Sequence, residues 1–130
     1  MAIQDNIFYR EEHVWLKEAF DYKLTNFAAT IICNKISRKF KINCVIHKFR
    51  GNRQSGTAYY QHINVSHNPT LGLLIHEIAH IYNNQHDLRL AAHDYRLKES
   101  MIKIFDYCKL KNFWKNEDFI LGALSDRRSK

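Results

Sequence analysis

The sequence has little of what marks disordered, secreted or membrane-spanning chains. Its 130 residues include one proline and four glycines, with 45% hydrophobic and 25% charged residues. This balance excludes a disordered tail, a collagen-like repeat and a low-complexity linker. The start, Met1 to Asn6, lacks the basic and then apolar order of a secretory signal, and the longest apolar run, Leu71 to Ile75, is too short to span a membrane. We therefore expect one globular domain over residues 1–130.

Cysteine is also scarce, and its spacing is uninformative for metal binding. The three cysteines are Cys33, Cys44 and Cys108, and no two of them form a Cys-x-x-Cys pair. This pattern gives neither a disulfide framework nor a thiolate zinc ribbon. We expect reduced, mostly buried thiols in a cytoplasmic protein.

Acidic residues are absent from the middle of the chain. Residues 22–76 hold eight basic residues and no acidic one, whereas residues 1–21 carry a net charge of −3 and residues 77–130 a net charge of +2, giving +7 in total. The basic segment is either a solvated face or a patch that attracts the phosphates of a nucleic acid such as DNA. The candidate nucleic-acid-binding residues are Lys35, Arg38, Lys39, Lys41, Lys48, Arg50 and Arg53.

The first half of the chain changes its hydrophobic period. Apolar residues three and four apart predict helices over 8–22 and 26–40, the second with a cap at its start. Over 42–50 the period drops to two, and after a Gly- and Ser-containing loop the segment 57–65 is again rich in strand-forming residues. We expect these two strands to form a hairpin or to lie side by side.

The second half is predicted to be helical. Asn68-Pro69 favours a helix start, with the asparagine as cap, and Asn83-Asn84 favours its end. This helix has almost no polar face, so we expect it to be buried. Further helices are predicted over 92–110 and 113–124. The order of two helices, two strands and three helices predicts a compact α+β fold.

The buried helix carries the pattern His76-Glu77-x-x-His80. Histidines four apart project from one helical face and can bind the same metal ion, and the glutamate beside them can reach a metal-bound water as a general base. The alternative is a structural pair bonded to main-chain carbonyls, with Glu77 paired to an arginine. Buried polar groups without partners cost roughly 2–7 kcal/mol each, so a Zn²⁺ site is the favoured interpretation.

A third ligand is needed, and three residues qualify. Counted along the chain from His80, His86 has the spacing of metzincins and Glu99 lies near the spacing of gluzincins. His93 precedes the next helix. His93 continues an inward-facing stripe, whereas Glu99 lies off that stripe. We prefer His93 and keep the other two open. The stripe comprises Leu97, Met101, Ile104 and Cys108.

These segments resemble the SprT-like zinc metallopeptidases, which include bacterial SprT proteins and the DNA–protein crosslink protease Spartan. The resemblance covers about residues 57–105 and rests on a strand ending at 63–66, on the helix 74–80 and on the helix opening at His93. It implies a zincin-like domain with His93 as third ligand. The chain departs from the family at Asp94, where glycine is usual, at Leu97, where an aromatic residue is usual, and in lacking a C-terminal cysteine ribbon.

The leading hypothesis is a zinc-dependent endopeptidase that acts on polypeptides, including DNA-associated proteins. His76, His80 and His93 would bind Zn²⁺, Glu77 would activate water, and a substrate would pair with an exposed strand edge near residues 59–65. The alternatives are a basic nucleic-acid-associated protein with a structural or vestigial zinc site, and a metzincin-type protease that uses His86. The remaining candidates are His62 for lining a cleft and three tyrosines for donating to an oxyanion, Tyr59, Tyr60 and Tyr95.

Overall fold

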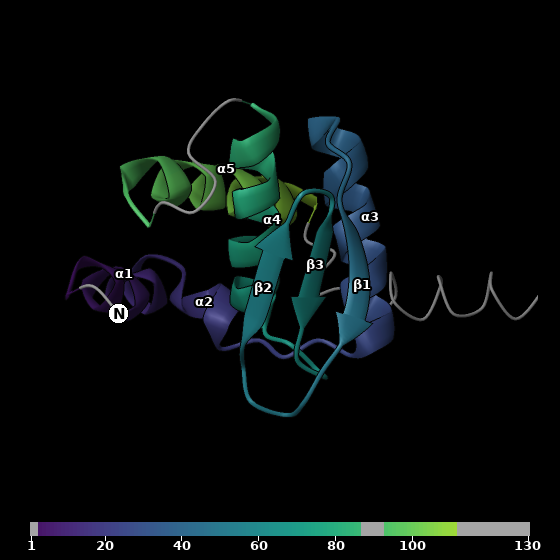
Figure 1. Cartoon of the computed structure of the whole chain (residues 1–130), viewed down its shortest axis with the longest axis horizontal. Coiled ribbons are helices and arrows are strands. Elements are labelled where there is room, and N and C mark those ends of the chain that lie inside the picture. Colours follow the sequence, from purple (N-terminus) through teal and green to yellow (C-terminus); the bar gives the residue numbers. More distant parts are fainter. Residues whose placement is uncertain (1–2, 87–92, 112–130) are drawn as a thin grey trace, which may run out of the picture.

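The computed structural model describes residues 3–86 and 93–111 and has an α+β fold. A three-stranded sheet packs with one face on α3 and α4, and α5 packs against α4 (Figure 1). The predicted fold class is confirmed. The elements follow the order α1 (Ile3–Trp15), α2 (Lys17–Phe20), α3 (Asn26–Phe40), β1 (Val45–Phe49), β2 (Gly56–Tyr59), β3 (His62–Val65), α4 (Leu71–Gln85) and α5 (Tyr95–Lys111).

The sheet has three strands where the sequence predicts two. β3 is central, with β1 parallel on one side and β2 antiparallel on the other. The predicted strand 57–65 is therefore a tight hairpin, which turns at Tyr60 with a positive φ of 51°. The prediction missed this turn because it has none of the glycine or asparagine that usually supplies such a conformation. The prediction of an exposed strand edge near residues 59–65 is also wrong. β3 pairs with β1 on one side and with β2 on the other, so the edge of this hairpin is formed by β2.

The N-terminal helices differ from the predicted helix over 8–22. The chain forms α1 and α2 instead, because Leu16 between them leaves the helical conformation at φ −119° and ψ 38° and is buried in the core. α3 matches its predicted bounds. The Thr25 side chain caps it by accepting a hydrogen bond from the Ala28 N–H at 3.0 Å, as predicted.

The predicted buried helix is α4, and its cap differs from the prediction. The side chain of Thr70 accepts a hydrogen bond from the Leu73 N–H at 3.0 Å, whereas Asn68 lies before the helix with φ 50°. Twelve of the fifteen residues of α4 are buried. The helix continues to Gln85, past the predicted stop, because Asn83 is fully buried and accepts a hydrogen bond from the Ser100 hydroxyl of α5.

α5 begins at Tyr95, after Asp94. The Asp94 carboxylate accepts a hydrogen bond from the Arg96 N–H at 3.0 Å, so the residue that departs from the family pattern caps this helix. The predicted inward stripe is confirmed, since all four of its members are buried. The predicted helix 113–124 lies outside the described residues. Within the described residues, none of the helices has both the length and the apolar character required to cross a membrane.

Candidate metal centre

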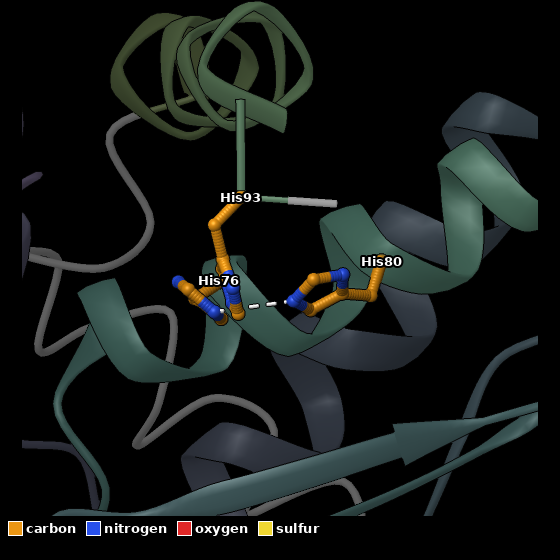
Figure 2. Close-up of side chains that lie close together, drawn as sticks. All are labelled: His76, His80 and His93. Carbon is orange, nitrogen blue, oxygen red and sulfur yellow. Dashed lines mark hydrogen bonds between the residues drawn. The ribbon is translucent and has the colours of Figure 1, made fainter. Parts of the chain in front are cut away.

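Three histidines meet beside α4. His76, His80 and His93 each offer a ring nitrogen, and these atoms lie within 4.8 Å of one another. Figure 2 shows the three rings pointing toward one another, His76 and His80 from α4 and His93 from the segment that leads into α5. The structure therefore brings together the two histidines of the motif and the preferred third residue.

The local geometry explains why these rings meet. His76 and His80 lie one helical turn apart, which puts them on the same face of α4. His93 reaches them because α5 packs against α4, where the buried hydrogen bond between Ser100 and Asn83 joins the two helices. The third residue is thus positioned by tertiary packing, 13 residues beyond the motif.

The spacing of the nitrogens suits a tetrahedral metal ion. Nε2 of His80 lies 3.2 Å from Nε2 of His76. Two nitrogens bound to a tetrahedral zinc at 2.0–2.1 Å are about 3.3 Å apart, so this pair needs almost no rearrangement. His76 is 4% and His80 8% exposed, and neutral imidazoles are ligands that zinc prefers. The three residues together form a candidate metal site.

Glu12 of α1 joins this group, and sequence reasoning missed it. Its Oε2 lies 2.8 Å from Nδ1 of His76, and both side chains are 5% exposed. Burial raises the pKa of the Glu12 carboxyl to about 7, partly offset by the charges of His13 and His93. Burial and the charge of His93 lower the pKa of His76 to about 3, so its imidazole is neutral at pH 7 in the metal-free protein. No sequence signal links Glu12 to a motif 64 residues away.

Tyr9 is the second residue that the sequence did not reveal. Its hydroxyl lies 3.2 Å from Nε2 of His93, and its ring stacks on His76 with a centroid distance of 5.8 Å. The buried ring of Phe8 also contacts the His93 ring, at 5.4 Å between centroids. α1 therefore covers the histidines with two aromatic rings and places a hydroxyl beside them.

Glu77 lies on the side of the site that faces β2. A cleft of about 450 Å³ opens there, and its lining includes Glu77, His76, Tyr9 and Gly56. The approach of Glu77 to β2 is close, because a Cβ added at Gly56 would lie 2.9 Å from Oε2 of Glu77. Burial raises the pKa of the Glu77 carboxyl to about 8, with a further contribution from the charge of Glu12.

The other two candidate ligands lie outside this cluster. His86 caps the end of α4, is exposed, and packs its ring on Tyr82. Because α4 continues through Asn83 without a turn, the chain does not bring His86 back to the cluster. Glu99 is exposed on α5, as its position off the stripe predicts.

The sheet residues named as candidates lie elsewhere as well. His62 packs between His47 and Tyr59, with centroid distances of 5.3 Å to each ring. Tyr60 and Tyr95 are 75% and 68% exposed, and Tyr59 is 39% exposed at the end of β2. The hydroxyl beside the histidine cluster is that of Tyr9 instead.

The basic candidates lie on α3 and β1 and in the segments that follow each of them. These elements lie side by side and run in opposite directions, so the end of α3 and the start of β1 share one end of the sheet (Figure 1). Arg38, Lys39 and Lys41 lie near that end, whereas Arg50 and Arg53 follow the end of β1. The five residues of β1 separate the two groups by about 16 Å. All of these side chains except Lys35 are exposed.

The chain was compared with family models, with curated proteins and with solved structures, and none of these matches it.

Proposed function

We propose that this chain is a zinc-dependent endopeptidase of the SprT-like type. The observation that supports this proposal most directly is the convergence of His76, His80 and His93 next to a buried glutamate at the head of a cleft. Three histidine ligands leave one position of a tetrahedral zinc for water, which is the arrangement of hydrolytic rather than structural sites. The buried free thiols favour a reducing compartment such as the cytoplasm.

Glu77 is the general base in this proposal. When bound, zinc would lower the pKa of its water toward ~7 and polarise the scissile carbonyl. The Glu77 carboxylate accepts the proton of the attacking water and passes it to the leaving amine. Burial raises the pKa of this carboxyl in the metal-free protein, and a general base is most effective when its pKa lies near the working pH.

Tyr9 supplies a hydrogen-bond donor at the histidine cluster. Its hydroxyl lies at the histidine cluster and its side chain lines the cleft, so an oxygen that gains negative charge there can accept from it. Tyr9 takes the role that the sequence suggested for Tyr59, Tyr60 or Tyr95.

The edge of β2 provides a place for an extended substrate. The Ser66 N–H donates to the Ser55 carbonyl at 3.0 Å, and antiparallel pairing then alternates along the hairpin. This alternation points the N–H and C=O of Gly56 and Ala58 away from β3. A peptide that pairs with these groups runs along the cleft past Glu77.

The replacement Glu77→Gln tests the chemistry. It removes the base and keeps the size of the side chain, so zinc content should be unchanged while cleavage of casein or histone falls by about 10²–10⁴-fold. The control is Glu99→Gln, an exposed acid on α5 that should leave both unchanged. Full activity of Glu77→Gln in a zinc-loaded preparation would remove this residue from the mechanism.

A proline at position 58 tests the substrate path. Because the Ala58 N–H points away from β3, Ala58→Pro should preserve the sheet and the zinc content but lower kcat/KM for peptides by roughly tenfold. Ala58→Ser retains the N–H and is the matched control. Equal activity of the two variants would place the substrate elsewhere.

A nucleic-acid-associated role is the second candidate function. It is favoured by the exposure of six of the seven basic candidates in a segment that has no acidic residue. If phosphate contacts contribute, affinity for single-stranded DNA should fall steeply with salt, and Arg38→Ser or Arg50→Ser should reduce that slope. Binding that is insensitive to salt would exclude such contacts. Cleavage assays with and without DNA would decide whether the two functions are linked.

A further inference from the structure

Glu12 hydrogen-bonds to Nδ1 of His76, whereas Nε2 of the same ring lies beside His80. We propose that Glu12 is a positioning residue of the metal centre, which makes α1 part of that centre. This inference rests on the zinc site of the proposed function. It concerns a residue that belongs to no motif in the sequence.

The contact determines which nitrogen of His76 can bind a metal. Oε2 of Glu12 lies 2.8 Å from Nδ1, and an ionised carboxylate there only accepts, so it favours the tautomer that carries its hydrogen on Nδ1. The lone pair of the neutral imidazole is then on Nε2, the atom that lies 3.2 Å from Nε2 of His80. A carboxylate in this position also raises the basicity of the ligating nitrogen.

The packing of α1 keeps the carboxylate in place. Tyr9 stacks on the His76 ring at an interplanar angle of 25°, and Phe8 meets the same ring edge-on at 6.1 Å between centroids. Phe8 is in turn fixed by an edge contact with Trp15. Glu12 itself is 4% exposed and lines the cleft beside His76. The ring is thus held on two sides while Glu12 holds its Nδ1.

The neighbouring Glu11 provides a matched control. It lies on the same helix with the same side chain, but it is exposed, whereas Glu12 is buried against His76. Glu11→Gln therefore removes the same charge from α1 and leaves the hydrogen bond between Glu12 and His76 in place. Glu12→Gln retains an oxygen that accepts from Nδ1, whereas Glu12→Ala removes the acceptor altogether.

The experiment measures zinc affinity by competition with a chromophoric chelator. We expect Glu12→Ala to bind zinc about 10–100-fold more weakly than wild type, Glu12→Gln to lose less, and Glu11→Gln to match wild type. The visible spectrum of the Co²⁺-loaded protein should change in Glu12→Ala and remain unchanged in Glu11→Gln. A role limited to folding would alter the thermal unfolding of the metal-free protein but neither of these measurements.

Two results would overturn the inference. The first is that Glu12→Ala folds and has the same zinc affinity and the same Co²⁺ spectrum as Glu11→Gln. The second applies if Glu12→Ala does not fold: it is that Glu12→Gln folds and has the same zinc affinity and Co²⁺ spectrum as wild type. Failure of the proposed function is a separate outcome, since a wild type that binds zinc without cleaving peptides would leave the role of Glu12 intact.

Discussion

Two groups of histidine rings lie in contact in this protein, and their surroundings differ. Beside α4, Nδ1 of His76 is hydrogen-bonded to a buried carboxylate, and three rings converge. On the sheet, His47 and His62 lie on neighbouring strands, and Nδ1 of His62 has no hydrogen-bond partner among the described residues. Ring contact alone therefore does not identify a metal site. The group beside α4 differs from the group on the sheet in having a third histidine ring and a carboxylate that is hydrogen-bonded to one of the rings.

The location of the two groups explains this difference. Strand pairing brings side chains of adjacent strands together wherever they share a face of the sheet. The contact between His47 and His62 needs no further explanation. His76 and His80 interrupt a helix that is otherwise apolar and buried, where unpaired polar groups destabilise the fold. Such groups persist where another interaction satisfies them, as Glu12 does for His76 and as a metal ion would do under the proposed function.

Removing one histidine from each group should give the largest contrast. His80→Ala removes a proposed zinc ligand. Losing the hydrogen-bond partner of a ligand can raise the zinc dissociation constant by roughly 100-fold, so losing a ligand itself should raise it by more. His62→Ala should leave it unchanged. Metal analysis after dialysis against a chelator measures both. An equal loss of zinc in the two variants would contradict the distinction drawn here.

A smaller contrast is expected between two tyrosines that lie beside the two groups. Tyr9→Phe keeps the ring that stacks on His76 but removes the hydroxyl, so kcat/KM should fall by about 100-fold with zinc retained. Tyr59→Phe makes the same change next to His62 and should have no effect on turnover. Steady-state kinetics on a peptide substrate measure both variants. Unchanged kinetics for Tyr9→Phe would show that the Tyr9 hydroxyl does not donate to the oxyanion.

The smallest expected effect is a pH dependence of the metal-free protein. The pKa of Glu77 is raised from 4.5 to about 8 in the folded state, so between these values the folded chain holds a proton that the unfolded chain has lost. Stability should therefore fall as pH rises through this window, by on the order of 1–2 kcal/mol between pH 6.5 and 8. Urea unfolding at several pH values measures it. Glu77→Gln should flatten the curve, whereas His62→Gln should not. A wild-type curve that rises with pH would contradict the burial of this carboxyl.

The sequence predicted the local features of the site. The buried helix, the facing pair His76 and His80, and the buried stripe of α5 all follow from the 3.6-residue period of a helix, whereas His93, which precedes α5, is positioned by tertiary packing. Its errors arose where neighbours in space override local signals. Tyr60 turns the chain without a glycine, and α4 continues past Asn83, whose side-chain oxygen accepts a hydrogen bond from Ser100 of α5.

The amino-acid sequence by itself determined which residues lie on the inner face of α4, because that depends only on spacing along one helix. The tertiary structure alone decided that Glu12 and Tyr9 of α1 meet those residues, and that the basic residues of α3 and β1 separate into two groups. Contacts across 64 residues leave no periodic signal in the chain. They arise from the packing of one helix on another, which depends on every side chain at the interface.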